Sequence, residues 1–181
     1  MEFLNLINIK TLFFIIPCVL LIHEMEEWNI YEFHKKSYSS GVDGETKLGG
    51  RLWLIFLSLT GFLWTIVCSF IPNTAVSALV MMLLVEFVLL NAIQHIGLTA
   101  KTKKYNPGFI FGGIFGLFSA CFVVWRIIAA NTLPVWAAAA LLCLIIPGII
   151  ESAISSKKNK LPKMVEWILQ FSCKLEKIMT E

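Results

Sequence analysis

The longest stretch without a charged residue runs from Leu52 to Val85, 34 residues with no Asp, Glu, Lys or Arg. A single α-helix of this length would measure about 51 Å, whereas the hydrocarbon core of a bilayer is about 30 Å thick. The dipeptide Pro72-Asn73 divides the stretch, because both residue types favour turns. The sequence therefore predicts two helices here, at about 51–71 and 75–99, each long enough to cross a membrane.

The composition of the whole chain also favours a membrane protein. Hydrophobic residues make up 57% of the chain and charged residues 15%, whereas soluble domains average about 45–50% and about 25%. A soluble fold would have to expose much of this apolar surface, and disordered chains contain far fewer apolar residues. The five cysteines are an odd number without a Cys-x-x-Cys pair, which argues against a secreted disulfide scaffold.

Three further apolar stretches complete the predicted bundle. The charge-free run from Thr11 to Ile22 is too short by itself, so the first helix is expected to include the polar residues 23–27. The fifth helix is expected to begin near Pro134, because proline suits the first turn of a helix. We predict an all-α polytopic membrane bundle in one domain, 1–156, with five transmembrane helices at about 7–30, 51–71, 75–99, 107–130 and 133–154.

The segment after the bundle, 157–181, predicts an amphipathic tail with a helix over about 161–179. Apolar residues recur there at helical spacing, namely Met164, Ile168, Phe171, Leu175 and Ile178. We expect this helix to lie on the cytoplasmic face of the lipid bilayer, with a short soluble tail as the alternative.

The distribution of Lys and Arg predicts the orientation of the bundle. Thirteen of the 15 lie in the loop after the first helix, in the loop after the third helix or in the tail. Five spans place these three segments on one side, which the positive-inside rule makes the cytoplasm, with the N-terminus outside. Because the topology rule accounts for these charges, they give no indication of a nucleic-acid partner. The oligomeric state stays open.

Several ionisable residues fall inside the predicted helices, where they are costly and usually functional. His23, Glu26 and Glu27 lie at positions i, i+3 and i+4 and so share one face of the first helix. Asn91 and His95 are four residues apart and share a face of the third helix. Because both helices run in the same direction in the predicted topology, these two faces reach the cytoplasmic level of the bundle together.

Two imidazoles and two carboxylates at one depth form a ligand set for a divalent metal, with Zn²⁺ the first choice. We predict four metal ligands: His23, Glu26, Glu27 and His95. Asn91 and Glu151, which ends the fifth helix near the same level, are predicted to hold these ligands in place. The alternatives are that the acids face water at a helix end, or that the histidines form hydrogen bonds between helices.

Three other ionisable residues have simpler interpretations. Glu24 is expected to lie in water at the end of the first helix, or to support the metal ligands. His34 is expected in a solvated loop. Glu86 lies nine residues before His95, on the opposite face of the third helix and about 13 Å deeper, so we do not expect both in one site.

Three short segments stand out by their order along the chain: His23-Glu24-Met25-Glu26-Glu27, Asn91-Ala92-Ile93-Gln94-His95 and Tyr105-Asn106-Pro107-Gly108. Together they resemble the bacterial membrane proteins named for their HXXEE motif, over roughly residues 15–120. The resemblance implies a protein of the bacterial inner membrane, with metal binding or membrane enzymology. It implies functional roles for His23, Glu26, Glu27 and His95. Some members have His where this chain has Asn91, which implies one ligand fewer here.

Three functions remain open from the sequence. The first is a metal-dependent membrane hydrolase of a lipid or peptide, in which His23, His95 and one carboxylate bind the metal. The other carboxylate, Glu26 or Glu27, would be the general base. The second is an accessory or immunity-type membrane protein whose polar cluster is a structural hydrogen-bond network. The third is an ion-coupled carrier using Glu86, although 181 residues without a repeat is small for a transporter.

Overall fold

The computed structural model describes residues 7–37, 45–158 and 160–180, and the regular structure in these ranges is helical. The prediction of an all-α fold is confirmed. The elements in chain order are α2 (Ile9–Leu12), α3 (Ile15–Glu26), α4 (Ile30–Ser37), α5 (Lys47–Phe70), α6 (Thr74–Thr102), the π-helix η1 (Phe109–Phe115), α7 (Gly116–Ala129), α8 (Val135–Leu142), the 3₁₀ turn η2 (Cys143–Ile145), α9 (Ile146–Lys157) and α10 (Lys163–Thr180).

In the described ranges, four helical segments are long and apolar enough to cross a membrane. They are α5, α6, the segment Phe109–Ala129 formed by η1 and α7, and the segment Val135–Lys157 formed by α8, η2 and α9. Each lies within a few residues of a predicted span. The turn between α5 and α6 forms where Pro72-Asn73 predicts it. The side chain of Asn73 accepts hydrogen bonds from the N–H groups of Ala75 at 2.9 Å and Val76 at 3.1 Å, and so caps α6.

The first predicted span, at about 7–30, is divided into α2 and α3, with Phe13 and Phe14 between them. Pro17 accounts for the division, because it has no N–H for the carbonyl of Phe13 and its ring crowds that carbonyl. The second difference is at the other end, where α3 stops at Glu26 and a short turn leads into α4.

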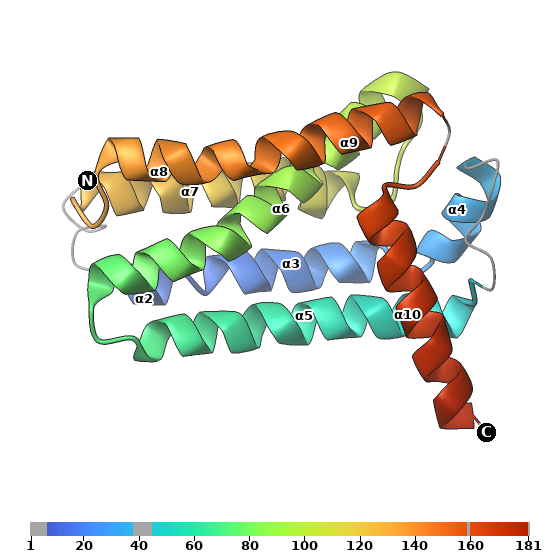
Figure 1. Ribbon diagram of the computed structural model, residues 1–181, viewed down its shortest axis with the longest axis horizontal. Helices are drawn as coiled ribbons and strands as arrows, with labels where there is room; N and C mark the ends of the chain where they lie inside the picture. Colours follow the sequence, from blue (N-terminus) through green and yellow to red (C-terminus); the bar gives the residue numbers. More distant parts are fainter. Residues whose placement is uncertain (1–6, 38–44, 159, 181) are drawn as a thin grey trace.

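Two helix pairs form the body of the bundle. α3 lies beside α5 and antiparallel to it, and α6, which crosses the bundle obliquely, packs against α7 (Figure 1). The buried core lies where α3, α6 and α7 meet, and its most enclosed side chains include Ile16, Leu20, Met81, Met82, Val85, Val123 and Ile127. In the α8 to α9 segment only Ala138 is buried. This segment therefore leaves most of its surface, which is largely apolar as far as Ile150, at the edge of the bundle.

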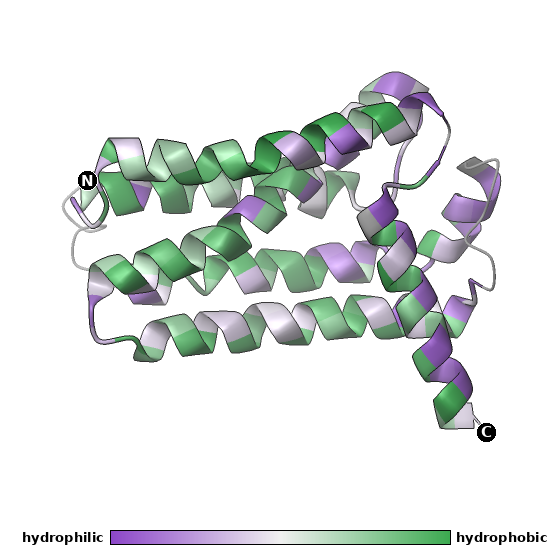
Figure 2. Cartoon of the chain, viewed as in Figure 1, coloured by the Kyte–Doolittle hydropathy of each residue, from purple (hydrophilic) through white to green (hydrophobic). Residues whose placement is uncertain are grey.

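α10 crosses one end of α5 at a steep angle (Figure 1). Its inner face buries Leu169, which packs with Leu161, Val165 and Trp53. Hydrophilic residues gather at this end of the molecule, on α4, on α10 and in the connections beside them (Figure 2). Large apolar side chains on the outer face of α10 are exposed: Trp167, Phe171, Leu175 and Ile178. Of the predicted apolar stripe, Ile168 is buried, and the side chain of Met164 lies outside the described part of the molecule.

Candidate metal centre

His23 is buried in the last turn of α3, with 2% of its surface exposed. Its ring meets the ring of His95 from α6 edge-on, with 4.9 Å between the centroids. Glu27 directly follows α3 and contacts both rings. Its Oε1 lies 3.4 Å from Nε2 of His95, and its Oε2 lies 3.9 Å from Nε2 of His23. One ligand atom from each of the three residues lies within 4.8 Å of the others, so a single ion could contact all three. We refer to them as the His23–Glu27–His95 cluster.

Two asparagines hold the imidazoles in place. Nδ2 of Asn91 lies 2.8 Å from Nε2 of His23, and Nδ2 of Asn106 lies 2.9 Å from Nδ1 of His95. An amide nitrogen donates, so each imidazole nitrogen accepts. For His95 this bond fixes the ring with Nε2 facing Glu27. For His23, Asn91 occupies the same nitrogen that faces Glu27, so a metal bound there would displace this hydrogen bond.

Two glycines leave room for the cluster. Gly108 has a φ of +86°, in the left-handed region that favours glycine. A Cβ at this position would lie 2.6 Å from Cε1 of both His23 and His95, and 2.7 Å from Oε1 of Glu27. A Cβ at Gly112 would lie 2.4 Å from Nδ1 of His23. The backbone of the loop and of η1 therefore forms one wall of the site.

Glu26 secures this wall rather than joining the cluster. Its carboxylate accepts hydrogen bonds from the N–H groups of Ile110 at 3.1 Å and Phe111 at 2.8 Å, and from the hydroxyl of Tyr105. Tyr105 is largely exposed, but local desolvation of its hydroxyl and this bond to Glu26 raise its pKa to about 12, so the hydroxyl stays protonated and donating at neutral pH. The carboxylate thus caps the first turn of η1, a π-helix, which is a rare element often found at functional sites.

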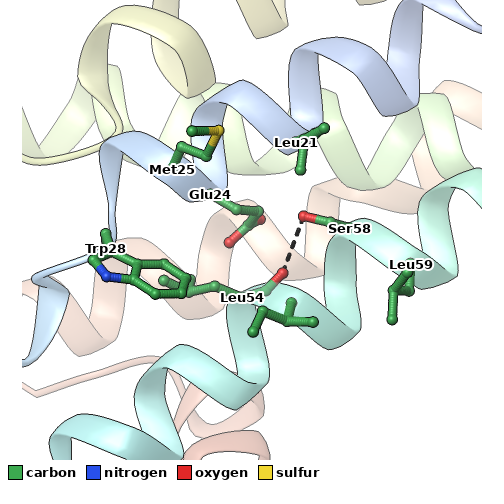
Figure 3. A pocket seen from close by; sticks show the side chains of 8 residues that line it. Leu21, Glu24, Met25, Trp28, Leu54, Ser58 and Leu59 are labelled. Carbon is green, nitrogen blue, oxygen red and sulfur yellow. Dashed lines mark hydrogen bonds between the residues drawn. The ribbon is translucent and has the colours of Figure 1, made fainter.

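Glu24 is the residue of the site that sequence reasoning misplaced. The expectation that it lies in water is wrong, because it is 3% exposed. Its Oε1 lies 3.9 Å from Nε2 of His23, and neither carboxylate oxygen has a hydrogen-bond partner among the described residues. It lines a groove between α3 and α5, where the nearby hydroxyl of Ser58 donates instead to the carbonyl of Leu54 (Figure 3). One sequence feature could have predicted the position of Glu24 beside the cluster. Glu24 and Glu27 are three residues apart, which places both on one side of the helix.

The remaining predicted residues lie outside the cluster. Glu151 accepts a hydrogen bond at 2.9 Å from the N–H of Lys163, the first residue of α10, and so caps that helix. Glu86 is buried in α6, and one of its oxygens has no partner among the described residues. The expectation for His34 is wrong, because it is 6% exposed within α4 and its Nδ1 lies 2.9 Å from the carboxylate of Glu45.

The charges around the cluster fit a divalent cation. Among the described residues, the ion pairs of Glu24 and Glu27 are formed with histidines alone. With both carboxylates ionised, the buried Glu24 and the half-buried Glu27 would place two negative charges beside the imidazoles, and unbalanced charge is costly away from water. One divalent cation would balance them. Two histidines and a glutamate also form the ligand set of a class of catalytic zinc sites, so both charge and donor type fit the ion predicted from the sequence.

The comparisons with known proteins identify one family. A family model described as a protein of unknown function with HXXEE motif matches residues 14–124, more than half of the chain. The chain belongs to the HXXEE family. The matched region contains the whole His23–Glu27–His95 cluster and both glycines that make room for it. No curated protein and no solved structure matches this HXXEE protein.

Proposed function

We propose that this HXXEE protein is a metal-dependent membrane hydrolase whose divalent cation, Zn²⁺ by ligand type, is bound by His23, Glu27 and His95. The observation that carries the proposal is the convergence of the three ligand atoms within 4.8 Å of one another. Two further features support it. Glu27 and His95 line a cavity that can admit a substrate, and the unpartnered carboxylate of Glu24 lies beside them.

The proposal includes five membrane spans in the inner membrane of a bacterium. α2 and α3 together cover residues 9–26, about 27 Å of helix, which is close to the thickness of the hydrocarbon core. The Lys and Arg distribution supports an outside N-terminus and a cytoplasmic C-terminus. α10 would lie in the cytoplasmic interface, supported by its steep crossing of α5 and by its exposed apolar residues Trp167, Phe171 and Ile178.

The residues around the site divide the work of hydrolysis. A bound cation would supply Lewis-acid activation of water and of a substrate oxygen. Glu24 would accept the proton of the attacking water and pass it to the leaving oxygen of an ester or the leaving nitrogen of a peptide. The oxygen of water bonds to the acyl or phosphoryl centre while the bond from that centre to the leaving oxygen or nitrogen breaks, so water is the only co-reactant. Asn106 orients His95, and Glu26 holds the loop against α3; both are positioning residues.

The metal content of the purified protein in detergent, measured by elemental mass spectrometry, tests the first part of this proposal. We expect close to one ion per chain in the natural protein, and loss of this ion in Glu27→Gln and in His95→Asn. Glu26→Gln is the matched control, because it removes a carboxylate one position away and should keep the ion. The metal site is disproved if the natural protein contains no ion when purified without chelator and takes none up on addition.

Hydrolysis itself is tested with the protein in vesicles of phosphatidylethanolamine and phosphatidylglycerol, with a mixture of apolar peptides, in water labelled with oxygen-18. We expect the label in one class of product, and no labelled product from Glu24→Gln assayed with enough added Zn²⁺ to fill its site. Labelled product at an unchanged rate from a metal-free sample would overturn the proposal.

A structural hydrogen-bond network is the second candidate, favoured by the bonds from Asn91 to His23 and from Asn106 to His95. In an accessory protein of this kind, His95→Asn lowers the unfolding temperature and no preparation contains stoichiometric metal. An ion-coupled carrier has the buried Glu86 in its favour. For a carrier, a Glu86→Gln variant should abolish uptake of a cation or proton into vesicles while hydrolysis is absent.

A further inference from the structure

A cavity of about 590 Å³ opens beside the metal centre, within the range of about 300–1,000 Å³ for small-molecule sites. α4, α5, α6, α9 and the first turns of α10 contribute to its wall. Most of the wall is apolar, for example Leu57, Phe87 and Leu90. Glu27 and His95 lie on the same wall, so an occupant of the cavity reaches the proposed metal.

Three lysines from different segments line this cavity. Lys101 is at the end of α6, Lys157 ends α9, and Lys160 lies in the connection to α10. The ammonium of Lys101 donates to the backbone carbonyl and to the hydroxyl of Ser156, which ties α6 to α9 at this point. Lys101 follows His95 by six residues on one helix, about 9 Å along its axis. The cationic part of the cavity and the metal centre therefore lie at different depths.

The positive-inside rule explains why lysines occur at this end of the bundle, but not why these three line one cavity. All six lysines of this region that the structure describes outside α10 are exposed, but Lys103, Lys104 and Lys158 are not part of the wall. A small anion such as free phosphate would leave the apolar wall uncovered, and an uncharged hydrocarbon would gain nothing from the charges of the lysines. The combination favours an amphiphile with a negatively charged head.

We infer that the cavity binds an anionic lipid, with its phosphate at Lys101, Lys157 and Lys160 and an acyl chain along the apolar wall. The ester of such a lipid lies between head and chain, at the depth of Glu27 and His95. The inference rests on the proposed function in naming this ester as the reacting bond. The binding of the lipid stands on the cavity and its charges alone.

Native mass spectrometry of the protein in detergent tests the inference with three probes. They are oleoyl lysophosphatidic acid, oleoyl lysophosphatidylcholine and glycerol 3-phosphate, which separate the charge of the head from the presence of a chain. We expect the anionic lipid to bind roughly tenfold more tightly than its zwitterionic counterpart, since each lysine contributes modestly near the surface. Glycerol 3-phosphate should not bind. Equal binding of the two lipids, or tight binding of the chainless phosphate, overturns the inference.

Two pairs of variants locate the lipid. Lys101→Gln/Lys157→Gln/Lys160→Gln should remove the preference for the anionic head, and the matched triple variant Lys103→Gln/Lys104→Gln/Lys158→Gln should retain it. Gly97 lines the cavity, and a Cβ there meets no atom within 4 Å, so a side chain at this position starts from open space on the wall. Gly97→Phe should prevent lipid binding, whereas Gly97→Ala should not.

Metal content measured on the same samples separates the two proposals. Gly97→Phe should lose the lipid and keep the metal, whereas His95→Asn should lose the metal and keep the lipid. A protein that holds metal but none of the lipids, or that retains a labelled apolar peptide in their place, overturns this inference and leaves the metal centre intact. Lipid bound by a protein without any metal overturns the proposed function and leaves the lipid site.

Discussion

Oε1 of Glu27 lies 3.4 Å from Nε2 of His95, although the two residues are 68 positions apart in the chain. The contact joins the end of α3 to α6. Gly108 adjoins both groups, and a Cβ there would lie 2.6 Å from His95 and 2.7 Å from Glu27. The approach of Glu27 to His95 therefore depends on a glycine in a third segment, and this dependence can be tested directly.

Gly108→Ala should disrupt the site and lower stability. Its φ of +86° costs a non-glycine residue about 1–2 kcal/mol, and the added methyl group also overlaps three side chains. We expect loss of bound metal and a lower unfolding temperature in detergent. Gly97→Ala is the control, because it lies in α6 with open space around its Cβ and should raise helix stability by up to about 1 kcal/mol. Equal metal content in the two variants would show that the glycine is not needed for the site.

Glu24→Gln should change stability in opposite directions with and without metal. In chelator, the variant removes a buried carboxylate that has no hydrogen-bond partner among the described residues, so its unfolding temperature should equal or exceed that of the natural protein. With Zn²⁺ present, the natural protein should gain more. A carboxylate about 4 Å from a unit charge contributes on the order of 4 kcal/mol at an effective dielectric constant of about 20. Thermal unfolding in both conditions measures the crossover.

The outcome against this prediction is a parallel shift, in which Zn²⁺ stabilises both proteins equally. Glu24 would then lie outside the electrostatic reach of the ion, and its role as proton acceptor would be withdrawn. Glu26→Gln serves as the reference, because the same change of charge occurs on a carboxylate already bonded to Ile110 and Phe111.

The spans and the general position of the site follow from sequence because the bilayer imposes simple rules. Its thickness limits helix length, so the charge-free run from Leu52 to Val85 divides at the predicted turn. Parallel helices with polar groups at corresponding ends bring His23 and His95 to one level. The spacing of four residues between His23 and Glu27 adds Glu27 to the same level. These are consequences of spacing alone, and spacing is what a sequence displays.

The assignment of the individual carboxylates does not follow from spacing. Glu24, Glu26 and Glu27 are so close together that their roles depend on where α3 ends and on what packs beside it. α3 stops at Glu26, and the π-helix η1 then presents N–H groups that the Glu26 carboxylate caps. No local pattern in Phe109–Phe115 indicates a π-helix, so the sequence does not show the N–H groups that Glu26 caps. Spacing alone therefore predicts Glu26 as a metal ligand and Glu24 as a solvated residue.

Tyr105 should ionise at an unusually high pH. Its pKa is raised to about 12, first by local desolvation of the hydroxyl and then by its bond to Glu26. At pH 11 a tyrosine with a pKa near 10 is about 90% ionised, whereas Tyr105 should be about 10% ionised. The group binds its proton more tightly when folded, so its contribution to stability is present below pH 10 and is lost as the pH rises through 12.

The measurement is tyrosinate absorbance at pH 11 for the natural protein and for Tyr105→Phe. The chain has three tyrosines, and the difference between the two proteins isolates this one. The two spectra should nearly coincide at pH 11 under folded conditions and differ by one tyrosinate after unfolding. A full tyrosinate difference in the folded state would show that the Glu26 anchor does not form.

Asn91→His should strengthen metal binding. Nδ2 of Asn91 lies 2.8 Å from Nε2 of His23, so it occupies the lone pair that a metal would need. An imidazole at this position removes the competing donor and adds a ligand of the type that zinc prefers, which should raise affinity about tenfold or more. Competition with a fluorescent zinc chelator measures the change.

Asn91→Ala separates the two causes, because it frees His23 without adding a ligand and should give a smaller gain. If Asn91→His binds zinc no better than the natural protein while remaining folded, His23 does not coordinate the ion through Nε2, and the site would have to be rebuilt around Glu27 and His95.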